Sequence, residues 1–539
     1  MEIKNLKKIM MVLGLLAVAL VMRLAYIQLV GHDELSAATR AQSLISLEGS
    51  NTRGIIYDRY GAALVADEKS YVYIISRNNY TKKAETLLKK AGAELIDSSD
   101  GEHYVYSSVG YDKETGRELM EGCGAYILQA SSRYGRQQPA AHLIGYVNKS
   151  DSSGAAGLEL MFDDRLAALE RKVYAAADVT GSIIPGRGLI IASEAKEDSY
   201  AQEGIRTTID RELQLKVEEI IGAREKNCAV VILDVRTGGV VAMACTPGFD
   251  PKQADKYVRS EGNELVNKAT QGEYPPGSIF KLVVAAAALE RGEDRGRTYV
   301  CSGSTELSDM SIRCDTGGNE GHGEISFEDA LAQSCNSYFI QLAQETGADE
   351  IIDMAYDMGL GRKALEGFPQ ESAGHLMTER ERGGNAIGNL AIGQGETLVT
   401  PLQVAAMTNV IAAGGVDKGV HILMHDEAKN DRIISQDTAE IIGDMMTLVT
   451  EEGTGGIIGK GFDGKPEAAV KTGTAEYGAK EKNMTHGWMT GFTPCDEPEY
   501  TITVLVENGT SGALSAGPVF AEIMEYLEES GSYSTPTLT

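Results

Sequence analysis

A serine and a lysine three residues apart suggest a hydroxyl nucleophile with a nearby base. Ser278 and Lys281 follow residues 274–277 (Tyr-Pro-Pro-Gly), whose prolines and glycine disfavour a helix before the serine. The Ala- and Leu-rich run over residues 282–290 favours a helix after it. We therefore expect Ser278 at a helix N-terminus, where backbone N–H groups and the helix dipole favour developing negative charge. A buried Lys281 on the same helix face could activate the hydroxyl without histidine.

The pair alone has a purely structural explanation, because serine is a common N-cap and lysine in the first helical turns is usually solvated. Two further motifs follow this pair along the chain. Ser334-x-Asn336 follows a short predicted helix, and residues 471–474 (Lys-Thr-Gly-Thr) end an apolar predicted strand. Each motif alone is most often a local cap or a strand edge. Together and in this order they match the set described for penicillin-binding proteins and serine β-lactamases.

The elements that must position these motifs mix helices with antiparallel strands. Apolar runs separated by the turn 235–238 predict a buried hairpin, and a strand meander is predicted late in the chain. The predicted strands cover residues 228–234, 239–244, 468–475, 487–492 and 500–506, and the predicted helices cover residues 210–223, 278–290, 326–333, 400–412 and 518–527. This order indicates an α+β domain in which helices flank an antiparallel sheet.

Length and charge narrow the class of protein. The chain has 539 residues, which leaves room for several domains with a large buried core. Its formal net charge of −28 argues against binding nucleic acid, because the phosphate backbone repels an acidic protein. A hydrophobic content of 42% excludes a mostly disordered chain.

The N-terminal region has the pattern of a membrane anchor. An apolar run over residues 9–22 follows three lysines, and the apolar pattern continues past Arg23 to Val30. We expect an uncleaved single-pass helix rather than a signal peptide, with the lysines on the cytoplasmic side and the catalytic domain outside the cytoplasm. The predicted parts are a cytoplasmic tip and transmembrane anchor (1–30), a non-catalytic pedestal resembling a dimerisation domain (31–195), a catalytic domain (196–530) and a disordered tail (531–539).

Cysteine and histidine spacing predict neither a metal nor another cofactor. Seven cysteines occur without a Cys-x-x-Cys pair, and none of the eight histidines has metal-ligand spacing. Cys301 and Cys314 could close a short disulfide, or they could be free buried thiols. Cys335, inside the second motif, is interpreted as a small buried residue.

Nearly the whole chain resembles class B penicillin-binding proteins, the membrane-anchored peptidoglycan D,D-transpeptidases of division, elongation or sporulation. Besides the three motifs, residues 53–61 and 157–159 look like signature stretches of the family's N-terminal module. Residues 321–323, 393–395 and 487–488 are similar to stretches of its transpeptidase domain. The resemblance implies a penicillin-binding-protein or serine β-lactamase-like fold on an elongated pedestal, with one N-terminal transmembrane helix.

The resemblance also implies a role for each motif residue. Ser278 is the expected nucleophile and Lys281 the expected base, if burial and the like charge of Lys471 lower its pKa. Ser334 is expected to relay a proton to the leaving amine, and Asn336 to orient Lys281 and hydrogen-bond the substrate backbone. The substrate carboxylate would be received by Lys471, Thr472 and Thr474, with Gly473 between them. The backbone N–H groups of Ser278 and Thr474 would form the oxyanion hole.

Three other functions fit parts of the pattern. A D,D-carboxypeptidase or β-lactamase would use the same motifs with water as the acceptor, a β-lactam sensor would keep the binding site, and an inactive scaffold would keep only the fold. The intact motifs, the anchor and the pedestal favour the transpeptidase. Expected partners are stem peptides of lipid-linked or nascent peptidoglycan, β-lactam antibiotics, the membrane and a membrane glycosyltransferase, with no nucleic acid.

Overall fold

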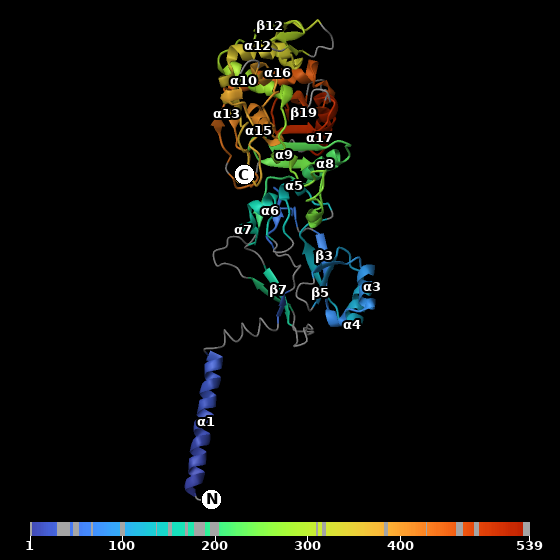
Figure 1. The fold of residues 1–539 in the computed structure, drawn as a ribbon, viewed down its shortest axis with the longest axis vertical. Helices are drawn as coiled ribbons and strands as arrows, with labels where there is room; N and C mark the ends of the chain where they lie inside the picture. The colour runs from blue at the N-terminus through green and yellow to red at the C-terminus, as the bar shows by residue number, and fades with distance from the viewer. Residues whose placement is uncertain are drawn as a thin grey trace. The chain divides into compact units, whose positions relative to one another are not determined.

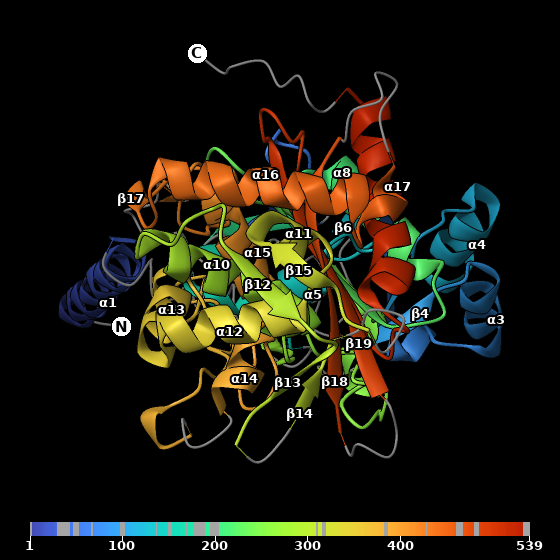
Figure 2. The same ribbon diagram turned by 90° about the horizontal axis from the view of Figure 1, so that it is seen from above.

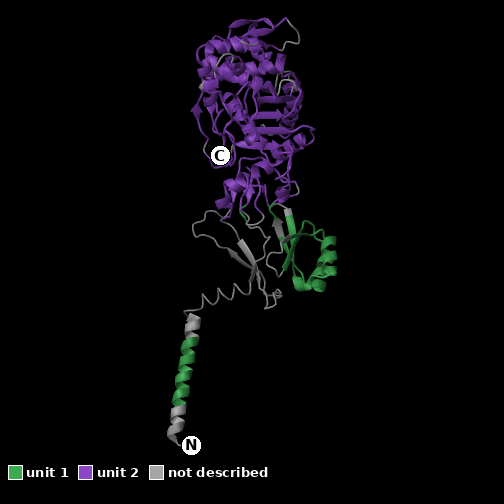
Figure 3. Ribbon diagram, viewed as in Figure 1, with its two compact units in different colours: residues 1–54, 66–133, 168–202 green, residues 55–65, 134–167, 203–539 purple. Residues whose placement is uncertain are grey.

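The structure is a computed structural model, and its described residues form two compact units (Figure 3). Unit 1 comprises Met1–Gly54, Ala66–Arg133 and Ala168–Gln202, and unit 2 comprises Ile55–Val65, Tyr134–Ala167 and Glu203–Thr539. The described residues are 3–29, 44–46, 53–65, 68–97, 103–135, 137–148, 153–167, 171–176, 189–193, 204–308, 311–314, 320–381, 386–426, 428–459, 467–478 and 484–531. The predicted tail over 531–539 lies outside this set except for its first residue.

The N-terminal run forms the long helix α1 (Ile3–Leu29), seen in Figure 1. Its apolar side chains from Met10 to Met22 are largely exposed. Among the helices of the described residues, none has both the length and the hydropathy needed to cross a bilayer.

Unit 1 contains a four-stranded antiparallel sheet with two helices packed on it. The strand order is β4 (Glu94–Asp97), β5 (His103–Ser108), β3 (Glu68–Ser76), β6 (Tyr126–Ser132). Helices α3 (Lys82–Lys90) and α4 (Lys113–Cys123) are capped by Thr81 and Asp112, whose side chains accept backbone N–H groups. Their apolar faces bury Leu88 and Leu119 beside Tyr73 of β3. A second sheet pairs β1 (Leu44–Ser46), β7 (Arg171–Ala176) and β8 (Leu189–Ser193).

Unit 2 is organised around a five-stranded antiparallel sheet, as predicted. The order is β11 (Val240–Cys245), β10 (Cys228–Asp234), β20 (Tyr500–Val506), β19 (Met484–Thr493), β18 (Ala469–Tyr477), so β18 is an edge strand. Every residue of β10, β11 and β20 is buried, because helices cover both faces of the sheet. Helices α8 (Arg211–Gly222) and α17 (Gly517–Glu529) pack on strands β11 and β20.

The opposite face of the sheet carries α15 (Pro401–Ala412), which begins with the predicted capping box of Thr400 and Gln403. Hydroxyl groups join this helix to the sheet, since Thr408 and Thr490 are 2.8 Å apart and Thr490 and Thr503 are 2.7 Å apart. Beyond α15 lie further helices of this layer, several of them labelled in Figure 2: α10 (Lys281–Glu290), α11 (Phe327–Ala332), α12 (Asn336–Thr346), α13 (Ala348–Asp357), α14 (Ala386–Ala391) and α16 (Gln436–Glu452).

Short elements complete unit 2. Two hairpins pair β12 (Thr298–Cys301) with β15 (Gly323–Ser326), and β13 (Ser304–Glu306) with β14 (Ser311–Arg313). Its other short elements are β16 (Val416–Asp417) with β17 (Asp431–Arg432), α9 (Lys268–Gln271), α5 (Ala141–Ile144), α6 (Gly157–Met161), α7 (Asp163–Ala167) and the turns η2 (Pro251–Lys256), η3 (Gly277–Phe280), η4 (Glu379–Glu381), η5 (Gly456–Ile458) and η7 (Gly512–Ala516). The turn η1 (Arg77–Asn79) belongs to unit 1.

The two units differ from the predicted division at residues 195 and 196. Residues 55–65 and 134–167, expected in the pedestal, cluster with the catalytic part. Strand β2 (Ile56–Tyr57) pairs in parallel with β9 (Ile205–Arg206), and Leu143 and Leu158 are buried in the same core as the sheet. The reason is packing between residues far apart in the sequence. The apolar residues of these two segments complete a core whose other members follow residue 204, and proximity along the chain does not reveal these contacts.

Candidate active site

Ser278 lies in the 3₁₀ turn η3, directly before α10, so the predicted helix N-terminus is present with a tighter first turn. The turn is fixed at its start by Gly277, whose N–H donates to the carbonyl of Gly393 at 2.8 Å. Gly277 has a φ of +56°, which glycine adopts without steric cost. At Gly393 a Cβ would lie 2.2 Å from the Gly277 oxygen, so a side chain there would push the serine turn out of place.

The edge strand β18 packs against this turn. At Gly473 a Cβ would lie 3.0 Å from Cγ1 of Ile279 and 3.1 Å from the carbonyl oxygen of Pro276. Glycine at this position therefore allows the strand backbone to approach the serine turn closely. Trp488 of β19, which is fully buried, donates from Nε1 to the Pro275 carbonyl at 3.1 Å and holds the same turn from the neighbouring strand.

The direction of the Thr474 backbone follows from its neighbour Glu476. In the amide orientation that satisfies both groups, Gln394 donates to the Glu476 carbonyl and accepts from the Glu476 N–H, each at 3.2 Å. Residues two apart in an antiparallel strand direct their N–H and C=O groups to the same side. The N–H and C=O of Thr474 therefore face the free edge of β18, the side where a Cβ at Gly277 would come within 2.8 Å of the Thr474 oxygen.

Lys281 is fully buried and its Nζ donates three hydrogen bonds. The acceptors are the Ser334 carbonyl at 2.6 Å, Oδ1 of Asn336 at 2.7 Å and Oγ of Ser334 at 3.2 Å. Nζ also lies 5.6 Å from the ring centroid of Phe339. The lysine of the first motif is thus held by the second motif.

Ser334 connects the two lysines. Its Oγ accepts from Nζ of Lys471 at 3.1 Å as well as from Nζ of Lys281. Lys471 is fully buried and also donates to the Thr472 carbonyl at 3.0 Å. Ser334 has a φ of +55°, a left-handed conformation that is uncommon for a residue with a side chain. The strained backbone places the hydroxyl between two amines, an arrangement suited to proton relay.

Asn336, the first residue of α12, has a defined amide orientation. Its Nδ2 donates to the carbonyl of Arg313 at 2.9 Å, so Oδ1 is the atom that faces Lys281. The predicted orienting contact with Lys281 is present in the structure.

Burial changes the protonation of both lysines. Burial lowers the pKa of Lys281 to about 8, which makes its neutral form accessible near physiological pH. The pKa of Lys471 is held well below its usual value, first by burial and then by the positive charge of Lys281. A buried amine that can lose its proton is a suitable general base.

The remaining predicted residues line β18 beside the serine turn. Thr472 is buried, and its Oγ1 lies 2.5 Å from Oγ1 of Thr454. Thr474 is exposed, and its Oγ1 accepts from the N–H of Gly512 at 3.3 Å. The structure therefore brings all three motifs of the sequence into one region, around the half-buried Ser278.

The family model for the penicillin-binding protein transpeptidase domain matches residues 228–525, which include all three motifs. The chain belongs to the class B penicillin-binding proteins. It is 29% identical over 84% of its length to penicillin-binding protein PbpB of Mycolicibacterium smegmatis, covering 72% of that protein. It is 24% identical over 93% of its length to peptidoglycan D,D-transpeptidase MrdA of Haemophilus influenzae, covering 88% of it.

Solved structures support the fold of this class B penicillin-binding protein. The penicillin-binding protein PBP2 of Helicobacter pylori, solved in complex with MreC, superposes with a TM-score of 0.67 at 21% identity. The match covers 91% of this chain and 99% of that one.

Sequence reasoning missed the structural role of Gln394 in this class B penicillin-binding protein. From the sequence, the stretch 393–395 shows only a family resemblance, whereas in the structure Gly393 supports the serine turn and Gln394 pairs with the free edge of β18. The two glycines around a polar residue were the available signal, because they permit a close backbone approach. The partner segments were not recognisable from the sequence.

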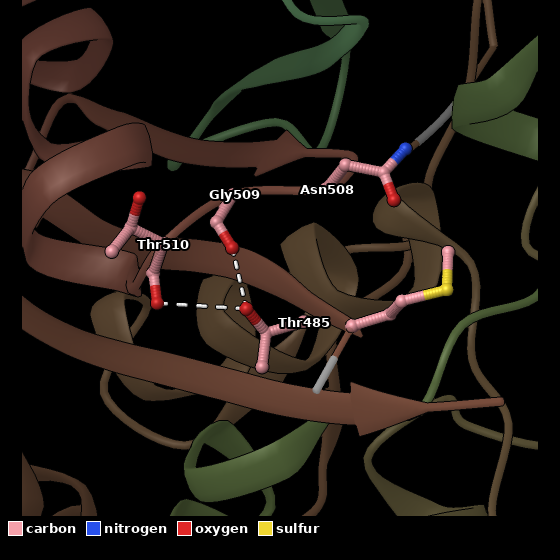
Figure 4. A pocket seen from close by; sticks show the side chains of 5 residues that line it. Thr485, Asn508, Gly509 and Thr510 are labelled. Carbon is pink, nitrogen blue, oxygen red and sulfur yellow. Dashed lines mark hydrogen bonds between the residues drawn. The ribbon is translucent and has the colours of Figure 1, made fainter. Parts of the chain in front are cut away.

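A separate hollow lies at the end of the β18–β19 hairpin (Figure 4). It is lined by Met484, Thr485, Asn508, Gly509 and Thr510. Thr485 Oγ1 donates to the carbonyl oxygens of Gly509 and Thr510, at 2.5 and 3.5 Å. None of the motif residues lines this hollow, which places it outside the catalytic groups.

Proposed function

We propose that this class B penicillin-binding protein is a peptidoglycan D,D-transpeptidase that works through an acyl-enzyme on Ser278. The observation that carries the proposal is the position of the Ser334 hydroxyl between Nζ of Lys281 and Nζ of Lys471. Both amines are fully buried and have lowered pKa values, so protons can pass between them and the hydroxyl. The names of the relatives, among them MrdA, support the same reaction and substrate.

In the first half of the reaction, Oγ of Ser278 attacks the carbonyl carbon of the penultimate D-alanine of a stem peptide. Its proton passes to neutral Lys281, and the bond to the nitrogen of the terminal D-alanine breaks. That nitrogen takes up a proton through the Ser334 hydroxyl and leaves as free D-alanine. The product is an ester between Ser278 and the shortened peptide.

In the second half, an amine of a neighbouring stem peptide attacks the ester. A new amide bond forms, the amine gives up its proton to the same lysine and serine groups, and Ser278 regains its hydroxyl. A β-lactam enters the first half as a substrate mimic, and its ring carbonyl forms the same ester.

Substrate recognition is assigned to residues 471–474 within β18. Lys471, Thr472 and Thr474 receive the terminal carboxylate, and Gly473 permits the close approach of this strand to the serine turn. The backbone N–H groups of Ser278 and Thr474 stabilise the oxyanion of the tetrahedral intermediate. The direction of the Thr474 backbone, toward the free edge of β18, supports this assignment.

The second candidate is a hydrolase, in which water replaces the acceptor amine. The test is to incubate the purified full chain with a labelled penicillin and with an acyl-D-Ala-D-Ala peptide, with and without an amine acceptor. The proposal predicts covalent label, a label lifetime of hours, and a cross-linked product that depends on the acceptor. Free shortened peptide without cross-link would favour the hydrolase, and an unlabelled chain would favour a scaffold.

The control for this assay is a pair of serine variants. Ser278→Ala should abolish the label, because the nucleophile is missing. Ser260→Ala changes an exposed serine of the same unit whose side chain hydrogen-bonds Glu264 and Gly262, and it should label like the parent. Label on both variants would show that another residue is acylated.

We also propose that residues 1–30 anchor the chain in the cell membrane with the catalytic unit outside the cytoplasm. The exposed apolar side chains over residues 10–22 of α1 and the three lysines in its first turns support the proposal. A membrane glycosyltransferase is the proposed protein partner, by analogy with the family. Cell fractionation tests the anchor: removal of residues 1–30 should release the chain from membranes, and unchanged sedimentation with membranes would contradict it.

A further inference from the structure

Three cysteines and a histidine converge in unit 2, next to the second motif. They are Cys301, Cys314, His322 and Cys335, and one donor atom of each lies within 4.8 Å of the donor atoms of the others. Sγ of Cys314 lies 3.6 Å from Sγ of Cys335 and 3.5 Å from Nδ1 of His322. The three cysteines are almost fully buried, and all three are free thiols.

Four different segments supply these side chains. Cys301 ends β12, and its register partner is Gly323 at the start of β15, which places His322 beside it. Cys314 follows β14, and its N–H donates to the carbonyl of Gly303 in the opposing turn at 2.9 Å. Cys335 is the N-cap of α12. The two hairpins and the helix start therefore meet at the four donor atoms.

Glycine residues allow the two hairpins to close around this point. Gly303 and Gly321 have φ values of +91° and +72°. A Cβ at Gly321 would lie 2.2 Å from the Cys301 carbonyl oxygen and 2.3 Å from the Gly303 nitrogen. The backbones can approach this closely only because residue 321 lacks a side chain, and Gly303 adopts its positive φ without steric cost.

The spacing of the donor atoms fits a tetrahedral ion better than a disulfide. Zinc–sulfur bonds of about 2.3 Å and zinc–nitrogen bonds of about 2.0–2.1 Å put tetrahedral ligands roughly 3.5–3.8 Å apart. The separations of 3.6 and 3.5 Å fall in this range. A disulfide requires sulfur atoms at about 2.05 Å, and the predicted alternative of a Cys301–Cys314 bridge is absent among these free thiols.

We propose that Cys301, Cys314, His322 and Cys335 bind one structural zinc ion. The four donors close the coordination shell, so no position is left for a substrate or water, as in other structural zinc sites. Three thiols lose their protons to solvent when the ion binds, and no electron is transferred. This inference goes beyond the transpeptidase reaction, which needs no metal in the mechanism proposed above.

The site links the zinc to the catalytic residues through the chain itself. Cys335 lies between Ser334 and Asn336, the two residues that hold Lys281. Arg313 precedes the ligand Cys314, and its carbonyl accepts the bond that orients Asn336. The zinc ion therefore fixes the backbone on which Ser334 and Asn336 lie. Its loss loosens their contacts to Lys281 without removing any catalytic group.

The test is direct metal analysis of the full chain, produced without a metal-affinity tag. We expect about one zinc per chain by elemental mass spectrometry. Chelation should remove the zinc and lower the melting temperature of the chain by at least about 5 °C, and added zinc, but not magnesium, should restore it. A chain with less than about a tenth of an equivalent of zinc that also fails to take up added zinc overturns the proposal, as does iron as the resident metal.

Matched cysteine variants assign the ligands. Cys314→Ser and His322→Ala should each lose most of the zinc, whereas Cys228→Ser, which changes a buried cysteine of β10, should keep it. If a ligand variant does not fold, cobalt reconstitution of the chelated parent replaces it as the measurement. Thiolate-to-cobalt charge-transfer bands and intense tetrahedral ligand-field bands are expected, and a spectrum of octahedral cobalt without thiolate bands overturns the assignment.

Catalysis supplies a second readout that distinguishes this inference from the proposed function. Chelated chain should be acylated by penicillin about tenfold more slowly, and zinc should restore the rate. A zinc-free parent with normal stability and a normal acylation rate would overturn the zinc site while leaving the transpeptidase proposal intact. A zinc-loaded chain that penicillin does not acylate would overturn the transpeptidase proposal while leaving the zinc site intact.

Discussion

Oγ of Ser334 accepts a hydrogen bond of 3.1 Å from Nζ of Lys471, a residue 137 positions later in the chain. The same oxygen accepts a second hydrogen bond, of 3.2 Å, from Nζ of Lys281. A single hydroxyl therefore bridges the amines of the first and third motifs. The bridge holds both amines close to one oxygen, where the positive charge of Lys281 adds to burial in lowering the pKa of Lys471.

Removal of the Ser334 hydroxyl should slow acylation strongly while leaving the fold intact. Ser334→Ala leaves both buried amines without their shared acceptor, and we expect the second-order rate of penicillin acylation to fall about 10²–10³-fold. Stopped-flow or gel-based labelling measures this rate.

Ser334→Gly separates the hydroxyl from the backbone strain at this position. Because φ is +55°, glycine should adopt this backbone conformation more easily than alanine. The free energy of unfolding of Ser334→Gly should therefore exceed that of Ser334→Ala by about 1 kcal/mol. Acylation should be equally slow in both variants. Recovery of the rate in Ser334→Gly would show that backbone geometry, rather than the hydroxyl, limits the reaction.

Acylation should become faster as pH rises through the pKa of Lys281. Burial lowers this pKa to about 8, and the base must be neutral to accept a proton, so the active fraction is small below this pH and large above it. Lys471 also faces Ser334, and burial together with the positive charge of Lys281 holds its pKa well below the usual value, so its titration adds to the pH dependence. We expect the rate to rise over roughly pH 7 to 9, with Ser278→Ala as the blank. A flat profile over this range would exclude Lys281 as the base.

Asn336→Asp should move that profile toward higher pH. The new carboxylate replaces Oδ1, which lies 2.7 Å from Nζ of Lys281, and an adjacent negative charge favours the ammonium form. The change also removes the donor to the Arg313 carbonyl. Acylation at neutral pH should therefore fall by at least tenfold and recover in part at higher pH.

Asn430→Asp is the matched control for this charge change. Asn430 is exposed, and its Oδ1 accepts from Nζ of Lys418 at 2.8 Å, so the variant creates the same pair at the surface. Solvent screens that pair, and the pH profile of acylation should stay unchanged. An equal shift in both variants would point to net charge rather than the local contact.

Gly473→Ala should separate β18 from the serine turn. The added Cβ would lie 3.0 Å from Cγ1 of Ile279, 3.1 Å from the Pro276 carbonyl oxygen and 3.2 Å from Cβ of Trp488, so the strand must move by a few tenths of an ångström. We expect acylation to fall about tenfold or more, because β18, the proposed binding strand for the substrate carboxylate, is displaced relative to Ser278. The free energy of unfolding should fall by about 1–2 kcal/mol.

Gly222→Ala provides the comparison for a glycine with free space. It ends α8, and no atom lies within 4 Å of its added Cβ. Alanine should leave acylation unchanged and stabilise the chain by up to about 1 kcal/mol. Normal acylation in Gly473→Ala, measured beside this variant, would show that close packing of β18 is not needed.

Local features were predictable wherever a short segment carries its own physical signal. Prolines before Ser278 and alanines after it determine the start of α10, and Thr400 with Gln403 determines the start of α15. Alternation of apolar runs with turn residues located the β10–β11 hairpin and the strands of the late meander. The three motifs pointed to an acyl-transfer site because their residue types suit that chemistry in any fold that brings them together.

Only the tertiary structure decided which distant residues meet. The chain from Ser334 to Lys471 can be arranged in many ways. Packing of β18 against η3 and α16, and of α10 against α12 and α16, selects the one that puts both amines on one hydroxyl. Packing likewise assigns residues 55–65 to the catalytic unit and brings His322 to three cysteines whose sequence spacing shows no metal pattern. Propensity acts over a few residues, whereas burial and pKa depend on neighbours that chain order does not specify.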